Sequence, residues 1–159
     1  MATISKRASE SATETVQVVL PNDANPLGFI LGGTVMHLID IAGAITAARH
    51  SRRPMVTAAV DGLQFLHPIK IGDLIILKAH VTCVFTTSLE VEVEVFSEET
   101  LTGNRRMTSR AFLTFTTIAE DGRRDTLPAL IVETDDERRV CSEAQVRRAA
   151  RLKSRPIST

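Results

Sequence analysis

The chain has 159 residues, 43% of them hydrophobic, and its 19 lysines and arginines balance 19 aspartates and glutamates. This length and composition suit one globular domain with a real core and exclude a disordered chain. Zero net charge attracts neither nucleic acid nor an anionic membrane, and the absence of Trp and Tyr argues against base stacking. We therefore expect no nucleic acid and no membrane span.

The ends of the chain and its cysteines carry few signals. Residues 1–12 are rich in Ser, Ala and Glu without the apolar segment of a signal peptide, and we predict a disordered tail. Cys83 and Cys141 belong to no C-x-x-C motif. A disulfide between them remains an alternative, but we favour two reduced thiols in a cytoplasmic protein. The four histidines lack metal-binding spacing, so no metal site is expected.

The first strand is predicted over residues 13–20, where Val16, Val18 and Leu20 share one face. Turn formers in residues 21–26 end it. Residues 34–48 then form a helix that is apolar on nearly every side and continues to about residue 50. Such helices are buried in protein or in lipid. Asp40 interrupts this one too early for a span of roughly 20 apolar residues, so it is the central buried helix of a soluble domain.

Two features of this helix point beyond packing. Gly32 and Gly33 lower helix propensity by roughly 1 kcal/mol each inside a helix, but at its start they leave backbone N–H groups bare for a ligand. Asp40 is an ionisable group on an apolar helix, which is unfavourable unless the group is paired or used.

The rest of the chain is predicted as four strands and a charged helix. Residues 55–66, 74–85, 89–96 and 107–119 are the strands, with a bulge at Asp61-Gly62. In residues 89–96 the valines face inward and the glutamates outward, where Arg110 can pair with one of them. Residues 133–153 form a weakly amphipathic, arginine-rich helix.

These elements predict an α+β fold, with an antiparallel sheet of about five strands wrapped around one long helix. We divide the chain into the tail (1–12), the main domain (13–132) and the carboxy-terminal helix and tail (133–159). A lone sheet of this kind leaves its edges and part of the helix uncovered, so self-association is expected.

The order of motifs is distinctive: N-x-x-G-x-x-x-G-G-x-x-M-x-x-x-D, then A-A-R-H, then V-D-x-x-x-F-x-x-P-x-x-x-G-D, and T-S before an alternating strand. This pattern resembles the hotdog-fold acyl-CoA thioesterases, in particular the bacterial YciA-like and vertebrate brain acyl-CoA hydrolase group. It covers residues 25–119, and Pro26 departs from the pattern expected of the group.

The resemblance implies hydrolysis of an acyl-CoA to free acid and CoA, without metal or cofactor, in an oligomer of hotdog dimers, namely a trimer of dimers. The loop Asn of the group falls on Asn25, the helix Asp on Asp40, and the glycine-rich start on Gly32 and Gly33. The resemblance also implies contacts with the substrate or its CoA moiety from Thr34, Asp61, Phe65, Thr87 and Ser88.

Elementary chemistry gives these residues roles. A thioester needs a nucleophile, usually water, and donors for the developing oxyanion. The N–H groups of Gly33 and Thr34 are such donors, Asp40 is the base or nucleophile, and Asn25 orients the water or the carbonyl. The sequence has no G-x-S-x-G motif for a serine triad. Gly33 and Asp40 are about 10 Å apart along a helix, so we expect each site to combine Asn25 and Gly33 of one chain with Asp40 of its partner.

Structural alternatives remain for each residue. In these alternatives, Asp40 is a buried carboxylate that His37 or an arginine satisfies, and Asn25 is a turn residue. Gly32 and Gly33 are then needed only for close packing. Thr87 and Ser88 are then ordinary turn residues. Two other functions also stay open, a hotdog-fold hydratase or dehydratase acting on CoA thioesters and a non-catalytic acyl-CoA sensor.

Overall fold

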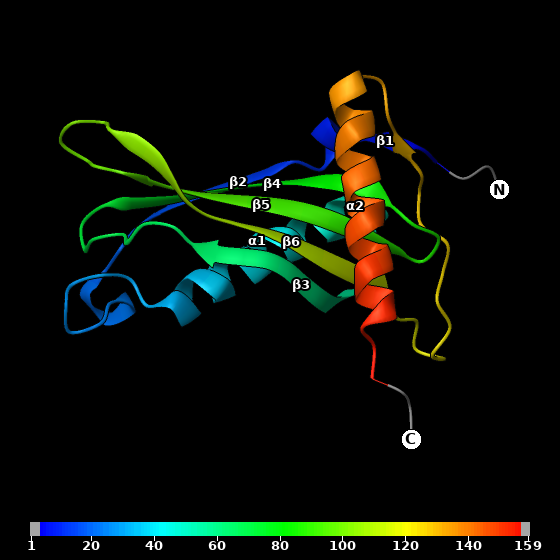
Figure 1. Cartoon of the computed structure of the whole chain (residues 1–159), viewed down its shortest axis with the longest axis horizontal. Coiled ribbons are helices and arrows are strands. Elements are labelled where there is room, and N and C mark those ends of the chain that lie inside the picture. The colour runs from blue at the N-terminus through cyan, green and yellow to red at the C-terminus, as the bar shows by residue number, and fades with distance from the viewer. Residues whose placement is uncertain (1–3, 157–159) are drawn as a thin grey trace.

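The computed structural model describes residues 4–156 and has a five-stranded antiparallel sheet with one long helix on each face (Figure 1). The strand order is β2-β4-β5-β6-β3. The main elements are β2 (Thr13–Val18), α1 (Gly32–Ser51), β3 (Met55–Phe65), β4 (Leu74–Val84), β5 (Ser88–Glu98), β6 (Arg105–Thr117) and α2 (Asp135–Lys153). The predicted α+β fold and its main elements are therefore confirmed. Neither helix within the described range is long and apolar enough to cross a membrane.

The core lies between α1 and the inner face of the sheet. Alternation along the strands directs every second side chain toward the helix, so Val91, Val93 and Leu113 are completely buried. Gly43 lets α1 approach closely, because a Cβ there would lie 3.0 Å from the ring of Phe115. The predicted bulge at Asp61-Gly62 is confirmed by a register shift in the pairing of β3 with β6.

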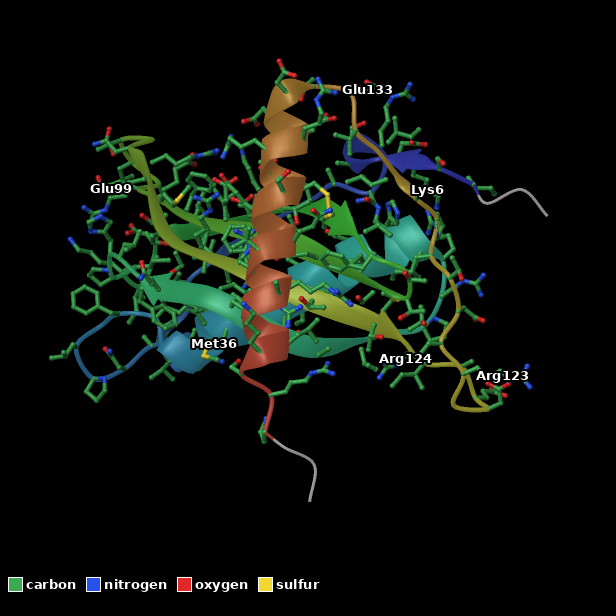
Figure 2. All side chains as sticks on the ribbon, turned by 45° about the vertical axis from the view of Figure 1, so that its right-hand side comes forward. Lys6, Met36, Glu99, Arg123, Arg124 and Glu133 are labelled. Carbon is green, nitrogen blue, oxygen red and sulfur yellow. A yellow bond between two sulfur atoms is a disulfide. The ribbon has the colours of Figure 1, made fainter. Side chains whose placement is uncertain are left out.

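Only one side of α1 is buried within a single chain. Met36, Ile41 and Ile45 are 39–47% exposed, and Met36 projects from the start of the helix (Figure 2). These side chains lie on the less buried half of α1 together with Gly33 and Asp40. Met36 and Asp40 follow Gly33 by three and seven positions, and Ile45 follows Ile41 by four. We call this face, made of Gly33, Met36, Asp40, Ile41 and Ile45, the open face of α1. This exposure agrees with the prediction that a single chain leaves part of the helix uncovered.

Both edges of the sheet also expose apolar side chains. β2 and β3 are the outermost strands, and each pairs with only one neighbour in the described part of the chain. Val16 and Val18 on β2, and Val56 and Val60 on β3, are 43–55% exposed. Monomeric proteins usually blunt such edges with charges or cover them, so these edges favour self-association.

The glutamates of β5 face away from α1, as predicted, but two of them are not solvent-exposed. Glu90 is 1% exposed and Glu92 is 4% exposed. The alternating pattern shows which face a side chain occupies, but not that α2 crosses this face of the sheet (Figure 1). The predicted pairing of Arg110 with a glutamate is confirmed, since its Nε lies 2.7 Å from an oxygen of Glu92.

The amino-terminal segment is ordered, so the predicted disordered tail is wrong for the described residues from position 4 onward. The short strand β1 (Lys6–Arg7) pairs in parallel with β7 (Leu130–Ile131), and a 3-10 turn, η1 (Ala8–Glu10), follows. The Lys6 ammonium donates a hydrogen bond of 2.8 Å to the carbonyl of His50 at the carboxyl end of α1. A cation at this end satisfies carbonyls that lack a helical partner. The first three residues of the predicted tail lie outside the described range.

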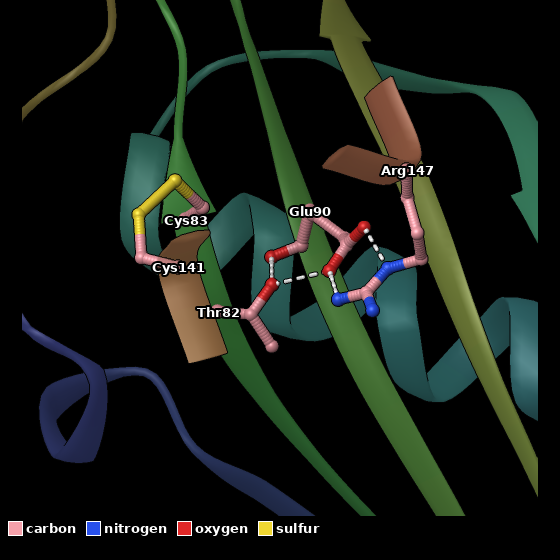
Figure 3. Close-up of a disulfide and its surroundings, with 5 residues drawn as sticks. All are labelled: Thr82, Cys83, Glu90, Cys141 and Arg147. Carbon is pink, nitrogen blue, oxygen red and sulfur yellow. Dashed lines mark hydrogen bonds and ion pairs between the residues drawn. A yellow bond between two sulfur atoms is a disulfide. The ribbon is translucent and has the colours of Figure 1, made fainter. Parts of the chain in front are cut away.

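Cys83 and Cys141 form a disulfide that joins β4 to α2 (Figure 3). Their Cα atoms lie 4.7 Å apart although 58 positions separate them in sequence. The prediction of two reduced thiols is therefore wrong, because the docking of α2 brings together cysteines that share no motif. The cytoplasmic location that was expected from reduced thiols therefore has no support from these cysteines.

Candidate active site

The loop before α1 places Asn25 at a turn that its own side chain holds. The side-chain oxygen of Asn25 accepts hydrogen bonds from the backbone N–H groups of Leu27 and Phe29, at 3.0 and 3.1 Å. The turn role considered for Asn25 is therefore present. Because the oxygen is occupied by two donors, the amide nitrogen is the part of the side chain left for a ligand. Asn25 can thus donate a hydrogen bond to a carbonyl oxygen.

The start of α1 provides a second set of donors. Leu31 is the N-cap residue and its side chain makes no capping hydrogen bond, so the first N–H groups of the helix have no side-chain partner. A Cβ built on Gly33 would meet nothing within 4 Å, and one on Gly32 would meet only the ring of Phe65 at 3.5 Å. Close packing within this chain therefore does not explain Gly33. Thr34 lies in the same first turn.

Asp40 lies two turns further along the open face of α1 and is partly buried. Its carboxylate accepts a hydrogen bond of 2.6 Å from the hydroxyl of Thr57 on β3. No Lys, Arg or His of residues 4–156 lies within 4.0 Å of it. The alternative in which His37 or an arginine satisfies this carboxylate does not hold within the chain. A rise of about 1.5 Å per residue separates Gly33 from Asp40 by about 10 Å.

Thr57 is the residue that sequence reasoning missed. It belongs to a stretch of β-branched and small residues, Val56 to Val60, that looks like any buried strand. Its partner Asp40 is 17 positions away, and no motif links the two. Only the packing of α1 against β3 brings them together.

A cavity of about 250 Å³ opens beside the start of α1, and its lining is mostly apolar, with Val35 and Phe65 beside Gly32 and with His67 and Ser109 as polar members. This volume lies below the roughly 300–1,000 Å³ usual for small-molecule sites. Phe65 and Gly32, two of the predicted contact residues, therefore do come together here.

The remaining predicted contacts lie elsewhere. The carboxylate of Asp61 is 2.6 Å from the Arg151 guanidinium of α2, so it is used in an ion pair. Thr87 lies in the turn between β4 and β5, and Ser88 is the first residue of β5. Both line a separate cavity of about 330 Å³ beneath α2. The structure thus divides the predicted site residues into a group around α1 and a group under α2. Among residues 4–156, no cluster of three or more His, Cys, Asp or Glu side chains could hold a metal ion.

A five-stranded antiparallel sheet wrapped on the long helix α1, with a glycine-rich helix start and an Asp two turns later, is a hotdog fold. Residues 27–104 match the thioesterase superfamily. The chain is 38% identical over 146 residues to YkhA of Bacillus subtilis, an uncharacterized acyl-CoA thioester hydrolase, covering 92% of this chain and 84% of that protein. The chain belongs to the thioesterase superfamily, among its acyl-CoA thioester hydrolases.

Solved structures agree with this assignment. An apo-hexameric acyl-CoA thioesterase superimposes with a TM-score of 0.90 and 35% identity, covering 98% of this chain and 99% of that one. The acyl-CoA hydrolase of Staphylococcus aureus was solved with butyryl-CoA, CoA and CoA disulfide. It superimposes with a TM-score of 0.84 and 33% identity, covering 94% of this chain and 93% of that one. The same hydrolase has been solved as alanine variants of an Asn, an Asp and a Thr. The resemblance found in the sequence is confirmed.

Proposed function

We propose that this protein hydrolyses acyl-CoA to a free carboxylic acid and CoA, with Asp40 as the reacting carboxylate. The observation that carries the proposal is the position of Asp40, which lies partly buried on an apolar helical face and is held by the neutral hydroxyl of Thr57. A carboxylate in this setting is free to take a proton from water. The S. aureus enzyme was altered at an Asn, an Asp and a Thr spaced as Asn25, Asp40 and Thr57 are here.

The reaction proceeds in two steps. Asp40 removes a proton from a water molecule, whose oxygen attacks the thioester carbon, while the N–H groups of Gly33 and Thr34 and the amide of Asn25 donate to the developing oxyanion. The C–S bond then breaks, the electron pair leaves on the CoA sulfur, and the proton held by Asp40 passes to that sulfur. Throughout the reaction, Thr57 donates a hydrogen bond to one carboxylate oxygen of Asp40 and so fixes the orientation of the other oxygen.

Asp40 could instead attack the carbonyl itself and form an acyl-enzyme anhydride that water then cleaves. A single turnover in ¹⁸O-labelled water distinguishes the two routes. Direct attack of water places the label in the free acid. The anhydride route, when water attacks the aspartyl carbonyl, places the label in Asp40, where mass spectrometry of the peptide detects it.

We propose that one complete site needs two chains. The oxyanion donors and Asp40 are about 10 Å apart on one helix, too far for both to act on the same carbonyl group. The open face of α1 exposes apolar side chains around Asp40, and two such faces packed about a two-fold axis would bring each Asp40 near the partner's helix start. The minimum active unit is then a dimer, and the hexameric neighbour supports a trimer of dimers.

Release of free thiol from a series of acyl-CoA substrates tests the proposal directly. We expect turnover by the wild-type protein and a loss of at least about 10²-fold in Asp40→Asn, the scale of removing a positioned acid–base group. The melting temperature should change little. Binding of acyl-CoA without thiol release would instead identify a sensor, and water addition to an enoyl-CoA would identify a hydratase.

A further inference from the structure

The packing of α2 on the sheet involves few apolar contacts. Of its 19 residues, all of which the structure describes, only Ala144 is buried, and Val146 is 69% exposed. Two cavities, of about 330 and 400 Å³, border the carboxy-terminal part of the helix. Burial of apolar surface is the main force that docks a helix, and one alanine buries little of it. The position of α2 therefore depends on its polar and covalent contacts.

The disulfide is the covalent contact between α2 and the sheet. It joins Cys141, in the second turn of α2, to Cys83 of β4 (Figure 3). Cys83 is 1% exposed, whereas Cys141 is only partly buried. A reductant from solution therefore reaches the sulfur of Cys141 more easily. Once the disulfide is reduced, the only covalent attachment of α2 to the domain is the chain before it, residues 132–134.

We propose that this disulfide is a redox latch, which a dithiol opens to release the carboxy-terminal part of α2 from the sheet. One thiolate of the dithiol attacks Sγ of Cys141, the S–S bond breaks, and the electron pair leaves on Sγ of Cys83, which takes up a proton. The second thiolate attacks the mixed disulfide and frees Cys141 as a thiol. The protein gains two electrons and two protons, and the dithiol becomes a disulfide. Exchange with a small-molecule disulfide runs the same steps in reverse and closes the latch.

The redox latch lies beside the ion pair that orients the helix. Cys83 is the cross-strand partner of Glu90 in the pairing of β4 with β5, and Arg147 binds Glu90 with hydrogen bonds of 3.0 and 2.7 Å. While the disulfide is closed, it holds Arg147 next to Glu90 at a high effective concentration. When the disulfide opens, both charges can return to water. The desolvation that a buried pair costs then favours release of the helix.

Release of α2 would also affect the edge strand β3. Arg151 of α2 lies 2.6 Å from the carboxylate of Asp61, and Thr57 of the same strand holds Asp40 of α1. A register irregularity between Thr57 and Ala59 separates these two contacts, so the strand is held from both of its faces. Loss of the Arg151 contact would therefore loosen the strand that positions Asp40. This step rests on the proposed function, whereas the redox latch itself does not.

Hydrogen exchange of the full chain, measured by mass spectrometry, tests the redox latch without turnover. Dithiothreitol should accelerate exchange along residues 142–153 at least about 10-fold and leave α1 and β5 unchanged, because a helix of this length is marginal without packing. A phosphine reductant should do the same, which excludes an effect of a thiol adduct. Equal exchange of these residues in the oxidised and reduced protein, or fast exchange of the whole chain, would overturn the proposal.

Two variants control this experiment. Cys83→Ser/Cys141→Ser should show the fast exchange of residues 142–153 with and without reductant, because it has no disulfide to open. Arg139→Ala, on the exposed side of α2, should respond to reductant as wild type does. A slow exchange of residues 142–153 in the double serine variant would show that the disulfide does not hold the helix.

Turnover tests whether the redox latch reaches Asp40. Hydrolysis is followed by the absorbance of the thioester, which tolerates a reductant. We expect reduction to lower kcat of wild type several-fold and to leave the double serine variant, already slow, unchanged. Arg151→Gln, with its disulfide intact, should also be slow, and reductant should slow it no further. Full kcat in reduced wild type would overturn the link to Asp40. A protein that hydrolyses no acyl-CoA would refute the proposed function, and hydrogen exchange would still decide the latch.

Discussion

Arg147 of α2 binds the buried carboxylate of Glu90 with two hydrogen bonds, of 3.0 and 2.7 Å, from Nε and one terminal nitrogen (Figure 3). The same carboxylate accepts a hydrogen bond of 2.7 Å from the hydroxyl of Thr82, and the guanidinium lies 3.6 Å from the centre of the Phe112 ring. The hydrogen bonds that Arg147 donates to the carboxylate of Glu90 raise the pKa of Arg147 above its ordinary value. This pair fixes how α2 lies on the sheet.

Removing one partner should therefore destabilise the fold. Arg147→Met leaves the carboxylate of Glu90 buried without its counter-charge, and we expect a loss of about 3–5 kcal/mol in the free energy of unfolding, measured in urea. Arg139→Met, at an exposed ion pair of the same helix, is the control and should change stability little. Glu90→Leu combined with Arg147→Met should recover most of the loss. Equal stabilities of Arg147→Met and wild type would show that the pair does not hold α2.

The disulfide should contribute by restricting the unfolded chain. Closing a loop of 58 positions is worth about 4 kcal/mol on the chain-entropy model, and measured values are often about 2–4 kcal/mol. We expect Cys83→Ser/Cys141→Ser to unfold at lower urea than the oxidised wild type. Adding a reductant should lower the wild-type midpoint and leave that of the double variant unchanged. A wild-type midpoint that does not respond to reductant would contradict a stabilising disulfide.

Gly33 and Gly43 should respond oppositely to alanine. A Cβ at Gly33 meets no atom of residues 4–156 within 4 Å, and alanine is a better helix former by up to about 1 kcal/mol, so Gly33→Ala should fold at least as stably as wild type. Its thioester turnover should nevertheless fall about 10-fold or more, because the methyl group lies where the carbonyl approaches the N–H donors. Gly43→Ala meets the Phe115 ring at 3.0 Å and should lose about 1–3 kcal/mol of stability. Full activity in a stable Gly33→Ala protein would show that this helix start is not part of the active site.

His50 should make stability depend on pH. Burial lowers the pKa of this histidine below its ordinary 6.5, and this effect outweighs the opposing hydrogen bond of 2.9 Å between Nε2 and the carbonyl of Pro128. The buried Nδ1 has no partner among the described residues. Below pH 6.5 the unfolded chain binds the proton more readily, so the contribution is complete above pH 6.5 and is lost as pH falls toward the lowered pKa. Unfolding free energies from pH 8 to 5 should show this slope. The control His67→Gln, at an exposed histidine, should keep the same slope of unfolding free energy against pH. His50→Gln should flatten this slope.

Mixing two inactive variants tests whether the site is shared. Asn25→Ala and Asp40→Ala are each expected to be inactive. In a mixed dimer one site carries both lesions and the other carries neither. Random pairing then restores about a quarter of the sites. Asp40→Ala mixed with Asp40→Asn is the control and should stay inactive. If mass spectrometry confirms subunit exchange and the first mixture stays inactive, the site lies within one chain.

The sequence by itself determined the strands, the central helix and the place of Asp40. Each of these depends on residues a few positions apart: valines that alternate along β5, apolar residues that surround an aspartate, and two glycines that precede it. Period and local composition are enough for such elements, because every neighbour that matters lies within one or two turns or one strand. The same local patterns carried the resemblance to the thioesterases.

The tertiary structure alone decided which distant residues meet. Thr57 reaches Asp40, Arg147 reaches Glu90 across 57 positions, and Cys83 reaches Cys141 across 58. Glu90 belongs to a strand in which valines and glutamates alternate, as in a strand with one face in solvent. Nothing nearby in the sequence shows that α2 covers this face. The face of the sheet on which a second helix lies is set by the sum of many weak contacts across the whole surface. No short segment of the chain contains that information.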